Sequence, residues 1–533
     1  MNPYNHLSTK KVCETTSKVD LWQMGALFSA FCGIATFLLL IFNYEPETFF
    51  SGLSSKTAYR FCGLKSYEDK VSVQFKRCTL VHVNVLFRHG TRAPDSKSIK
   101  SFSDLYERLK ESYNSGSPIP YKLLTHPIPF KNAAVKELLP RGFQEHDGLG
   151  RRFFNLMRQH FDFTIENVNF YSSSIDRCIA SGRAFYNGFI NGPTVKPIWN
   201  RTLYCGNEEV PNSCILNDEL SEINNDHYKK NITINNYLLR FFADCKNYIE
   251  KIENNKSAIQ EYYKFFKSNY IMNSYENFIK RFILKRENYK LDDLKTIFLA
   301  CAYEVAAMDD YDDLSPWCSL LTPYDYPVWE YLADLKHYWR KSYGYELNYE
   351  QSCPLLGEII QQIYNVAINF QKHNYSQNNP TLHRGSFWFG HAETILPIVA
   401  ALGIFNNSVG HSTLHKLTAD NFDERLKMIY DTDVPSPTMF RTSYIAPFAG
   451  NVAFLLYYCP DLEDSDNDLD KFRVKVLINE KTIAWPLSSS IQPPTLDHPG
   501  ETNASLTTIL QYFNGCMPNN YDNNKVCLLH KTL

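Results

Sequence analysis

An apolar run at residues 80–87 leads directly into the basic heptapeptide RHGTRAP. The run (LVHVNVLF) has the length and the β-branched content of a buried strand, and Arg88, His89 and Gly90 follow it at once. Arginine binds phosphate oxygens through paired N–H groups and keeps its charge, so Arg88 and Arg92 are suited to hold a phosphate. A neutral histidine between them could attack phosphorus and form a covalent intermediate. The alternative is an exposed basic turn, which the preceding buried strand disfavours.

The remaining periodicity predicts an α/β fold, with a core sheet flanked by helices and interrupted by a mostly helical inserted lobe. The aromatic and aliphatic stripe within residues 328–343 is typical of a buried core face rather than of a ligand site. There is no internal repeat, and the acidic run 461–470 is typical of a solvated loop. The strand-like segments are 168–171, 452–458 and 472–478; residues 387–402 predict a strand, a loop and a helix; residues 142–161 and 328–343 predict helices.

Residues 21–42 form an uncharged apolar segment in which Gln23 is the one strongly polar residue. A membrane-spanning helix needs about 20 such residues, whereas a cleaved signal has an apolar core of about 7–15 residues before a small-residue cleavage site. No convincing cleavage site follows, so we expect an uncleaved signal-anchor, with a cleaved signal or a buried core helix as the alternatives. Lys10, Lys11 and Lys18 precede the segment, which places that end in the cytosol and the catalytic bulk in the lumen or outside the cell.

The cysteines and sequons agree with this topology. Of the 14 cysteines, Cys13 precedes the apolar segment and Cys32 lies within it, and the even remainder lacks C-x-x-C spacing. In an oxidising compartment this pattern predicts several disulfides and no metal site. The terminal residues HKTL are not an ER-retrieval signal. The glycosylation candidates beyond the segment are Asn200, Asn231, Asn255, Asn374, Asn406 and Asn503.

Four motifs together resemble the histidine phosphatase superfamily, on the branch that holds the acid phosphatases and phytases. RHGTRAP is similar to that branch's signature, and LPRG at 139–142 and SSIDRC at 173–178 are similar to its second and third blocks. The distal motif His391-Ala392-Glu393 replaces the more usual His-Asp and is characteristic of the multiple inositol polyphosphate phosphatases. The resemblance spans residues 57–485 and is loose in the Asn-rich stretch 207–255. The chain departs from the subgroup in its apparent anchor and in its lack of a retrieval tail.

The resemblance implies a role for each motif residue. His89 is the expected nucleophile, and Glu393 is the expected general acid, which then activates water. Without the family, Arg177 would read as a structural salt-bridge residue, and His391 with Glu393 as an ordinary helix start. Fixed positive or polarising groups around a phosphoryl group stabilise its transition-state charge. The expected phosphate-binding residues are Arg88, Arg92, Arg177 and His391, and the further substrate-binding candidates are Lys97, Lys100 and Arg441.

The implied substrate is an inositol polyphosphate, including the hexakisphosphate, with 2,3-bisphosphoglycerate as a second candidate. A broader acid phosphatase and a catalytically silent binding protein of the same fold are the alternatives. The formal net charge of −2 gives no global attraction to nucleic acid, so local cations must meet an anionic substrate. No cofactor is expected.

By matching position, Cys78 with Cys459 is one expected disulfide. The expected divisions are a cytosolic tail (1–20), an anchor (21–42), a stalk (43–70), a core (71–200 and 375–485), a helical lobe (201–374) and a C-terminal extension (486–533).

Overall fold

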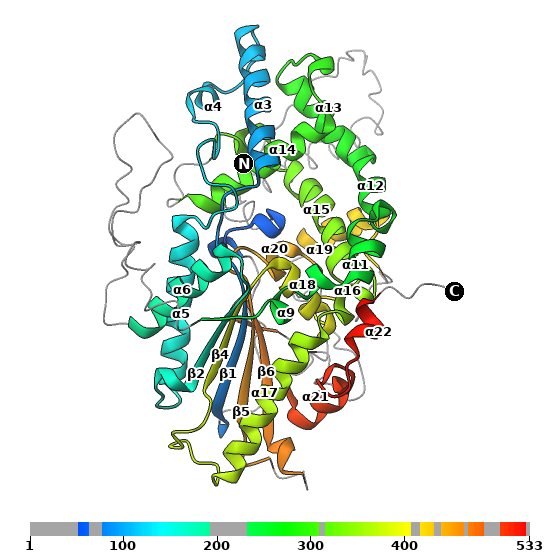
Figure 1. The fold of residues 1–533 in the computed structure, drawn as a ribbon. Coiled ribbons are helices and arrows are strands. Elements are labelled where there is room, and N and C mark those ends of the chain that lie inside the picture. Colours follow the sequence, from blue (N-terminus) through cyan, green and yellow to red (C-terminus); the bar gives the residue numbers. More distant parts are fainter. Residues whose placement is uncertain are drawn as a thin grey trace, which may run out of the picture. The chain divides into compact units, whose positions relative to one another are not determined.

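A mixed sheet forms the centre of the computed structural model, which describes residues 52–62, 77–191, 232–308, 315–406, 416–430, 439–462, 467–483, 485 and 502–528 (Figure 1). The expected tail and anchor, and the sequons at Asn200 and Asn231, lie outside these residues. Within them, no helix has both the length and the apolar character that a membrane crossing requires.

The strands run in the order β3-β2-β4-β1-β5-β6-β7. β8 is outside this order and also pairs with β6. β1 is parallel to β4, and β2 is parallel to both β4 and β3, whereas β5, β6, β7 and β8 join through antiparallel pairs. The strand segments expected from the sequence are confirmed. The strands are β1 (Thr79–Arg88), β2 (Val168–Ser172), β3 (Thr233–Ile234), β4 (Gly385–Gly390), β5 (Asn451–Tyr458), β6 (Phe472–Ile478), β7 (Lys481–Thr482) and β8 (Asn503–Ser505).

β1 is the strand that positions the site. Every residue from Leu80 to Arg88 is buried, as expected for a run of β-branched and aromatic residues in a sheet covered on both faces. Because β1, β4 and β2 are parallel, their carboxyl ends meet at one edge. His89, His391 and Ser173 each come directly after one of these strands, and this edge is where α/β sheets usually bind ligands.

Helices cover both faces of the sheet (Figure 1). α5 and α6 cover one face, where Phe87, Phe185 and Phe387 belong to an aromatic core. The two helices approach closely because Gly150 and Gly188 face backbone: a Cβ on Gly150 would lie 2.1 Å from the Phe185 oxygen. The helices are α3 (Ser96–Asn114), α4 (Tyr121–Thr125), α5 (Pro140–Arg158), α6 (Asp176–Asn191), α9 (Asn236–Leu239), α10 (Phe241–Asp244), α11 (Lys246–Tyr248), α12 (Gln260–Phe266), α13 (Asn269–Arg281), α14 (Leu291–Ala307), α15 (Asp325–Lys341), α16 (Leu347–Glu350), α17 (Cys353–Lys372), α18 (Ala392–Ala401), α19 (Phe422–Tyr430), α20 (Thr442–Ile445), α21 (Leu506–Tyr512) and α22 (Asn523–Cys527).

The structure differs from the expected divisions in three places. Residues 52–62, placed in a stalk, pack into the protein, with Leu53 and Ala58 fully buried. α17, placed in the helical lobe, lies beside the sheet, where Gln362 accepts a hydrogen bond from Asn84 of β1 at 3.1 Å. The C-terminal extension adds β8 to the sheet. In each case the segment contacts residues that are far away in the sequence, so the sequence pattern gave no sign of the contact.

Four disulfides cross-link the described chain, and three of them join residues at least 163 positions apart. Cys78–Cys459 ties the start of β1 to the end of β5, which confirms the expected pairing. The others are Cys245–Cys527, Cys301–Cys318 and Cys353–Cys516. Two of the four fasten the C-terminal extension to earlier helices. Disulfides of this number favour an oxidising compartment.

Candidate active site

The loop after β1 is fixed by backbone contacts. His89 donates its N–H to the Gly390 oxygen at 3.0 Å, and Ala449 donates to the His89 oxygen at 3.1 Å. Gly90 packs against the first turn of α5, where a Cβ would lie 2.5 Å from the Gly142 oxygen. The glycines of RHG and LPRG are therefore needed for one close approach of two backbones.

His89 is held in a single tautomer. Its Nδ1 lies 2.9 Å from the Gly90 oxygen, and because a carbonyl only accepts, Nδ1 carries the proton. The lone pair is therefore on Nε2. Burial, reinforced by the charges of Arg88 and Arg92, lowers the pKa of His89 well below its usual value. The ring is thus neutral and has a nucleophilic nitrogen, which is the state that attack on phosphorus requires.

Three arginines surround this ring. Arg88 donates from one terminal nitrogen to the Ser55 oxygen at 2.5 Å and to the Ala446 oxygen at 2.8 Å. Burial and the neighbouring Arg92 lower the pKa of Arg88 to about 10, so its charge persists at neutral pH. The Nε atoms of Arg88, Arg92 and Arg177 are buried and lack a hydrogen-bond partner among the described residues. These donors are available to an anion.

His391 comes at the carboxyl end of β4 and caps α18. Its backbone N–H donates to Thr394 Oγ1 at 3.1 Å, which fixes the turn. Arg177 donates to His391 Nδ1 at 3.3 Å, so the His391 proton resides on Nε2, 3.1 Å from Ser173 Oγ. Burial lowers the pKa of His391 to about 3. His89 and His391 face each other edge to face, with ring centroids 5.8 Å apart.

Glu393, in the first turn of α18, forms an ion pair with the last residue of α15. Lys341 Nζ donates to Glu393 Oε1 at 2.5 Å. Burial alone would raise the pKa of Glu393, but Lys341 and His391 hold this pKa well below its usual range. Sequence reasoning placed Glu393 here but missed Lys341.

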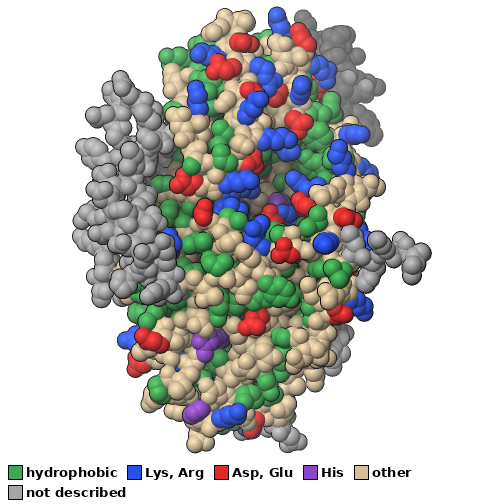
Figure 2. Space-filling view, viewed as in Figure 1, with side chains coloured by type: hydrophobic (Ala, Val, Ile, Leu, Met, Phe, Trp, Pro, Cys, Tyr) green, Lys and Arg blue, Asp and Glu red, His purple; other side chains and the backbone are tan. Residues whose placement is uncertain are grey.

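Further cations that the sequence did not predict lie beside the site. Lys56, in a short 3-10 helix (Ser54–Lys56), approaches the rings of Tyr303 and Phe448, and burial together with Arg88 lowers the pKa of Lys56 well below its usual value. Burial and its cationic neighbours lower the pKa of Lys336 to about 8. Figure 2 shows lysine and arginine side chains around a hollow near the middle of this face. The signal for the α15 cations was LKHYWRK, whose basic residues alternate with the aromatic stripe. We define the cleft cations as Lys56, Lys336, Arg340 and Lys341; Glu253, 3.5 Å from Arg340, offsets part of this charge.

The remaining candidate residues differ in exposure and in their partners. Lys97 and Lys100 are exposed in the first turns of α3. Arg441 is buried, donates to Glu330 at 2.7 Å and to the Tyr444 hydroxyl at 2.6 Å, so its guanidinium is engaged by protein groups, which favours a structural role over substrate binding. Among the sequons, Asn255 and Asn374 are exposed, Asn406 is half-buried, and Asn503 is buried in β8, where it accepts a hydrogen bond from Arg473.

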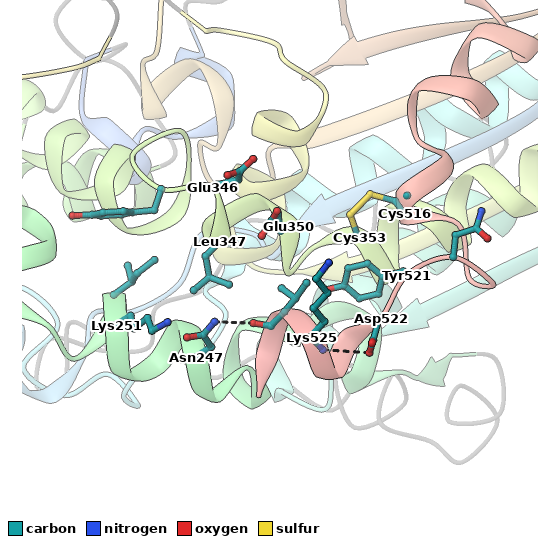
Figure 3. Close-up of a pocket in the computed structure, with 15 residues that line it drawn as sticks. Asn247, Lys251, Glu346, Leu347, Glu350, Cys353, Cys516, Tyr521, Asp522 and Lys525 are labelled. Carbon is teal, nitrogen blue, oxygen red and sulfur yellow. Dashed lines mark hydrogen bonds between the residues drawn. A yellow bond between two sulfur atoms is a disulfide. The ribbon is translucent and has the colours of Figure 1, made fainter. Parts of the chain in front are cut away.

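A separate cavity of about 880 Å³ lies between α11, α16 and the C-terminal extension (Figure 3). It is lined by Glu346, Glu350 and Asp522 together with Lys251 and Lys525, so acids and bases are mixed there. None of the motif residues lines it. Over the described residues, no group of His, Cys, Asp and Glu side chains is arranged to bind a metal ion.

Comparison with known proteins defines the class. The sequence profile of the histidine phosphatase superfamily (branch 2) matches residues 79–479, and the chain belongs to this family. The protein is therefore a hydrolase of the histidine phosphatase class.

Individual relatives are more specific. The chain is 27% identical to multiple inositol polyphosphate phosphatase 1 of Gallus gallus over 454 residues, which covers 85% of each protein. The solved phytase from D. castellii matches with a TM-score of 0.59 at 17% identity, over 91% of this chain and 88% of that one. Multiple inositol polyphosphate phosphatase of Bifidobacterium longum, in complex with inositol hexasulfate, matches with a TM-score of 0.58 at 15% identity, over 90% of this chain and all (100%) of that one. These two structures confirm the fold.

Proposed function

We propose that this protein removes phosphate from inositol polyphosphates, including the hexakisphosphate, through a phosphohistidine on His89. The observation that carries the proposal is the excess of positive charge beside the nucleophile. Three arginines are enough for the phosphate that reacts, yet the cleft cations lie beyond them. Crowded cations raise the energy of the empty site, so a polyanion that neutralises them is bound strongly. The relatives named above support the same substrate class.

The residues divide the reaction between them. Arg88, Arg92 and Arg177 would hold the phosphate oxygens, with the Nε2–H of His391 as a further donor. Nε2 of His89 attacks phosphorus while the bond to the ester oxygen breaks, and Glu393 in its protonated form gives that oxygen a proton. In the second half, the Glu393 carboxylate takes a proton from water, whose oxygen attacks the phosphohistidine and releases phosphate and His89.

2,3-Bisphosphoglycerate carries two phosphates and a carboxylate, so it would meet the same cations and is a second substrate under this proposal. The disulfides support a lumenal or extracellular location for the catalytic part. The apolar segment 21–42 is the basis for proposing a single-pass signal-anchor with the amino end in the cytosol.

The test uses the full chain, made in a eukaryotic secretory host, beside His89→Ala. Inositol hexakisphosphate and 4-nitrophenyl phosphate are supplied from acid to neutral pH, and phosphate release is measured. We expect release from both by the native protein, none above background by His89→Ala, and acid-labile label on the native protein alone after a quench with ³²P-labelled substrate. Release from the aryl phosphate alone would instead indicate a broader acid phosphatase, and folded protein without release would indicate a silent binding protein.

A further inference from the structure

Glu393 and Lys341 contact each other in a way that conflicts with the proton donation proposed for Glu393. A general acid must carry a proton, but the Lys341 ammonium lies 2.5 Å from Glu393 Oε1 and favours the carboxylate. Only 12% of the Lys341 side chain is exposed, against 37% for Glu393, so the pair is only partly screened by water. The protein without substrate therefore holds its acid in the unprotonated state.

The other charged groups around Glu393 act in the same direction, because each of them is a cation. The groups that surround Glu393 come from the amino-terminal segment, β1, α6, α11, α15 and the end of β4. The resulting pKa of Glu393 lies well below its usual range, because Lys341 and His391 outweigh the effect of burial. The titratable and charged groups that face Glu393 are Lys341, His337, Lys56, Arg88, Arg177, His391, the thiol of Cys178 and the phenol of Tyr248.

Lys341 has a competing place to bind. It ends α15, where Lys336 and Arg340 precede it by five residues and by one. A phosphate group near these side chains carries up to about two negative charges, against one for the carboxylate. Lysine is a flexible point charge and follows the stronger anion. A phosphate bound beside the reacting one would therefore draw Lys341 away from Glu393.

We propose that Lys341 makes proton donation by Glu393 conditional on a second phosphate in the cleft. This inference rests on the proposed function and gives Lys341 a positioning role that acts through Glu393. When the second phosphate takes Lys341, Glu393 gains a proton from solvent. That proton passes to the ester oxygen as the phosphorus–oxygen bond breaks and the phosphoryl group moves to His89 Nε2. A substrate with one phosphate leaves the ion pair intact, so its alkoxide must leave unprotonated.

The experiment compares three substrates of the full-length enzyme across pH. Glycerol 2-phosphate has one phosphate and a leaving group that needs a proton, inositol hexakisphosphate has neighbouring phosphates, and 4-nitrophenyl phosphate has a leaving group that needs none. For the native protein, we expect kcat/KM to fall as the pH rises, and to fall at a lower pH for glycerol 2-phosphate than for the hexakisphosphate. We call this fall the limb of the pH profile for each substrate. In Lys341→Met, the glycerol 2-phosphate limb should move to higher pH. If the limb moves up by one pH unit, kcat/KM for glycerol 2-phosphate at pH values above the native limb should be about tenfold higher than in the native protein.

Two control variants separate this role from a loss of charge. Lys372→Met removes an exposed charge from the end of α17, which carries none of the site residues, so the glycerol 2-phosphate limb should stay where the native protein has it. Lys341→Arg keeps the pair and should also keep the limb. In Lys341→Met, hexakisphosphate turnover should fall while the 4-nitrophenyl phosphate limb stays in place.

Native limbs that coincide for the two alkyl substrates, or a limb that does not move in Lys341→Met, would overturn the role of Lys341. Failure of the proposed function has a different signature, because the native protein would then release no phosphate from the hexakisphosphate at any pH.

Discussion

Helix α15 carries two groups of charged side chains that differ in how they are balanced. Glu330 and Asp334, near its middle, are buried and pair with Arg441 and Arg425, so two carboxylates meet two guanidiniums. Near its end, Lys341 contacts Glu393 and Arg340 lies 3.5 Å from Glu253, while Lys336 has no carboxylate partner among the described residues. One helix therefore holds a neutral network within the protein and a cationic surface beside His89.

The difference separates structural charges from functional ones. In the buried network, hydrogen bonds satisfy the carboxylates: Ser443 donates to Glu330 at 2.5 Å, and Thr442 donates its N–H to Asp334 at 3.1 Å. The cleft cations have burial and like charges nearby, which lower the pKa of Lys336 and of Lys56. A protein retains such unfavourable cations where a ligand neutralises them. Balance of charge, rather than burial alone, distinguishes the two groups.

The largest expected effect is on the buried network. Glu330→Gln would leave Arg441 buried without its counter-charge, and breaking a buried pair in this way costs about 3–5 kcal/mol of unfolding free energy. Chemical denaturation followed by fluorescence measures the change. Activity per folded molecule should stay near the native value, because the described contacts of Glu330 and Arg441 include no motif residue. A stable variant with low kcat would instead make Arg441 a substrate-binding residue, as the sequence suggested.

The next effect is on catalysis. Arg177→Met removes a charged donor beside His391, and loss of one such donor typically lowers the rate by about 10²–10³-fold. The unfolding free energy should change little, since Arg177 is half-buried and has no carboxylate partner described in the structure. Steady-state kinetics with inositol hexakisphosphate and the same denaturation measurement check both. A loss of stability equal to that of Glu330→Gln would place Arg177 with the structural charges.

Ionic strength should affect the cleft cations and the buried network differently, and this test needs no mutation. Raising ionic strength from about 0.01 M to about 0.15 M shortens the screening length from about 30 Å to about 8 Å. The KM for the hexakisphosphate should rise several-fold, and the KM for glycerol 2-phosphate should rise less. The denaturation midpoint should scarcely change, because buried pairs are little screened. Equal salt sensitivity of the two KM values would show that the cleft cations do not bind additional phosphates.

The smallest effect is expected at an exposed pair, which supplies the reference for the comparison. Arg158 and Asp162 lie 2.9 Å apart, with 46% and 95% of their side chains exposed. Such an i,i+4 pair contributes about 0.3–0.5 kcal/mol. Arg158→Ala should therefore change stability by no more than that and leave kinetics as they are. A loss near that of Glu330→Gln would mean that exposure does not decide the strength of these pairs.

The parts predicted from the sequence were those in which local signals act. The run at 80–87 was sufficient to predict β1. The family resemblance placed the motif residues in one site, and the structure shows that the parallel strands β1, β4 and β2 bring their loops to one edge. Lys56 and Lys341 were not predicted, because each reaches the site through tertiary packing. Lys56 lies in a segment that reads as a linker, and Lys341 ends a helix whose aromatic stripe indicated only a core. The ion pair of Arg441 was also not predicted, because its partner Glu330 is far away in the sequence.

The short segment 52–62 has a consequence for where the working enzyme begins. The family profile starts at residue 79, yet the Ser55 oxygen holds Arg88 and the Thr57 oxygen accepts from Phe448, whose ring lies 4.5 Å from the Arg88 guanidinium carbon. A boundary drawn where similarity begins would thus cut through the wall of the phosphate site. The region that the family profile matches is therefore shorter than the region that the phosphate site requires, because Ser55 and Thr57 precede the match.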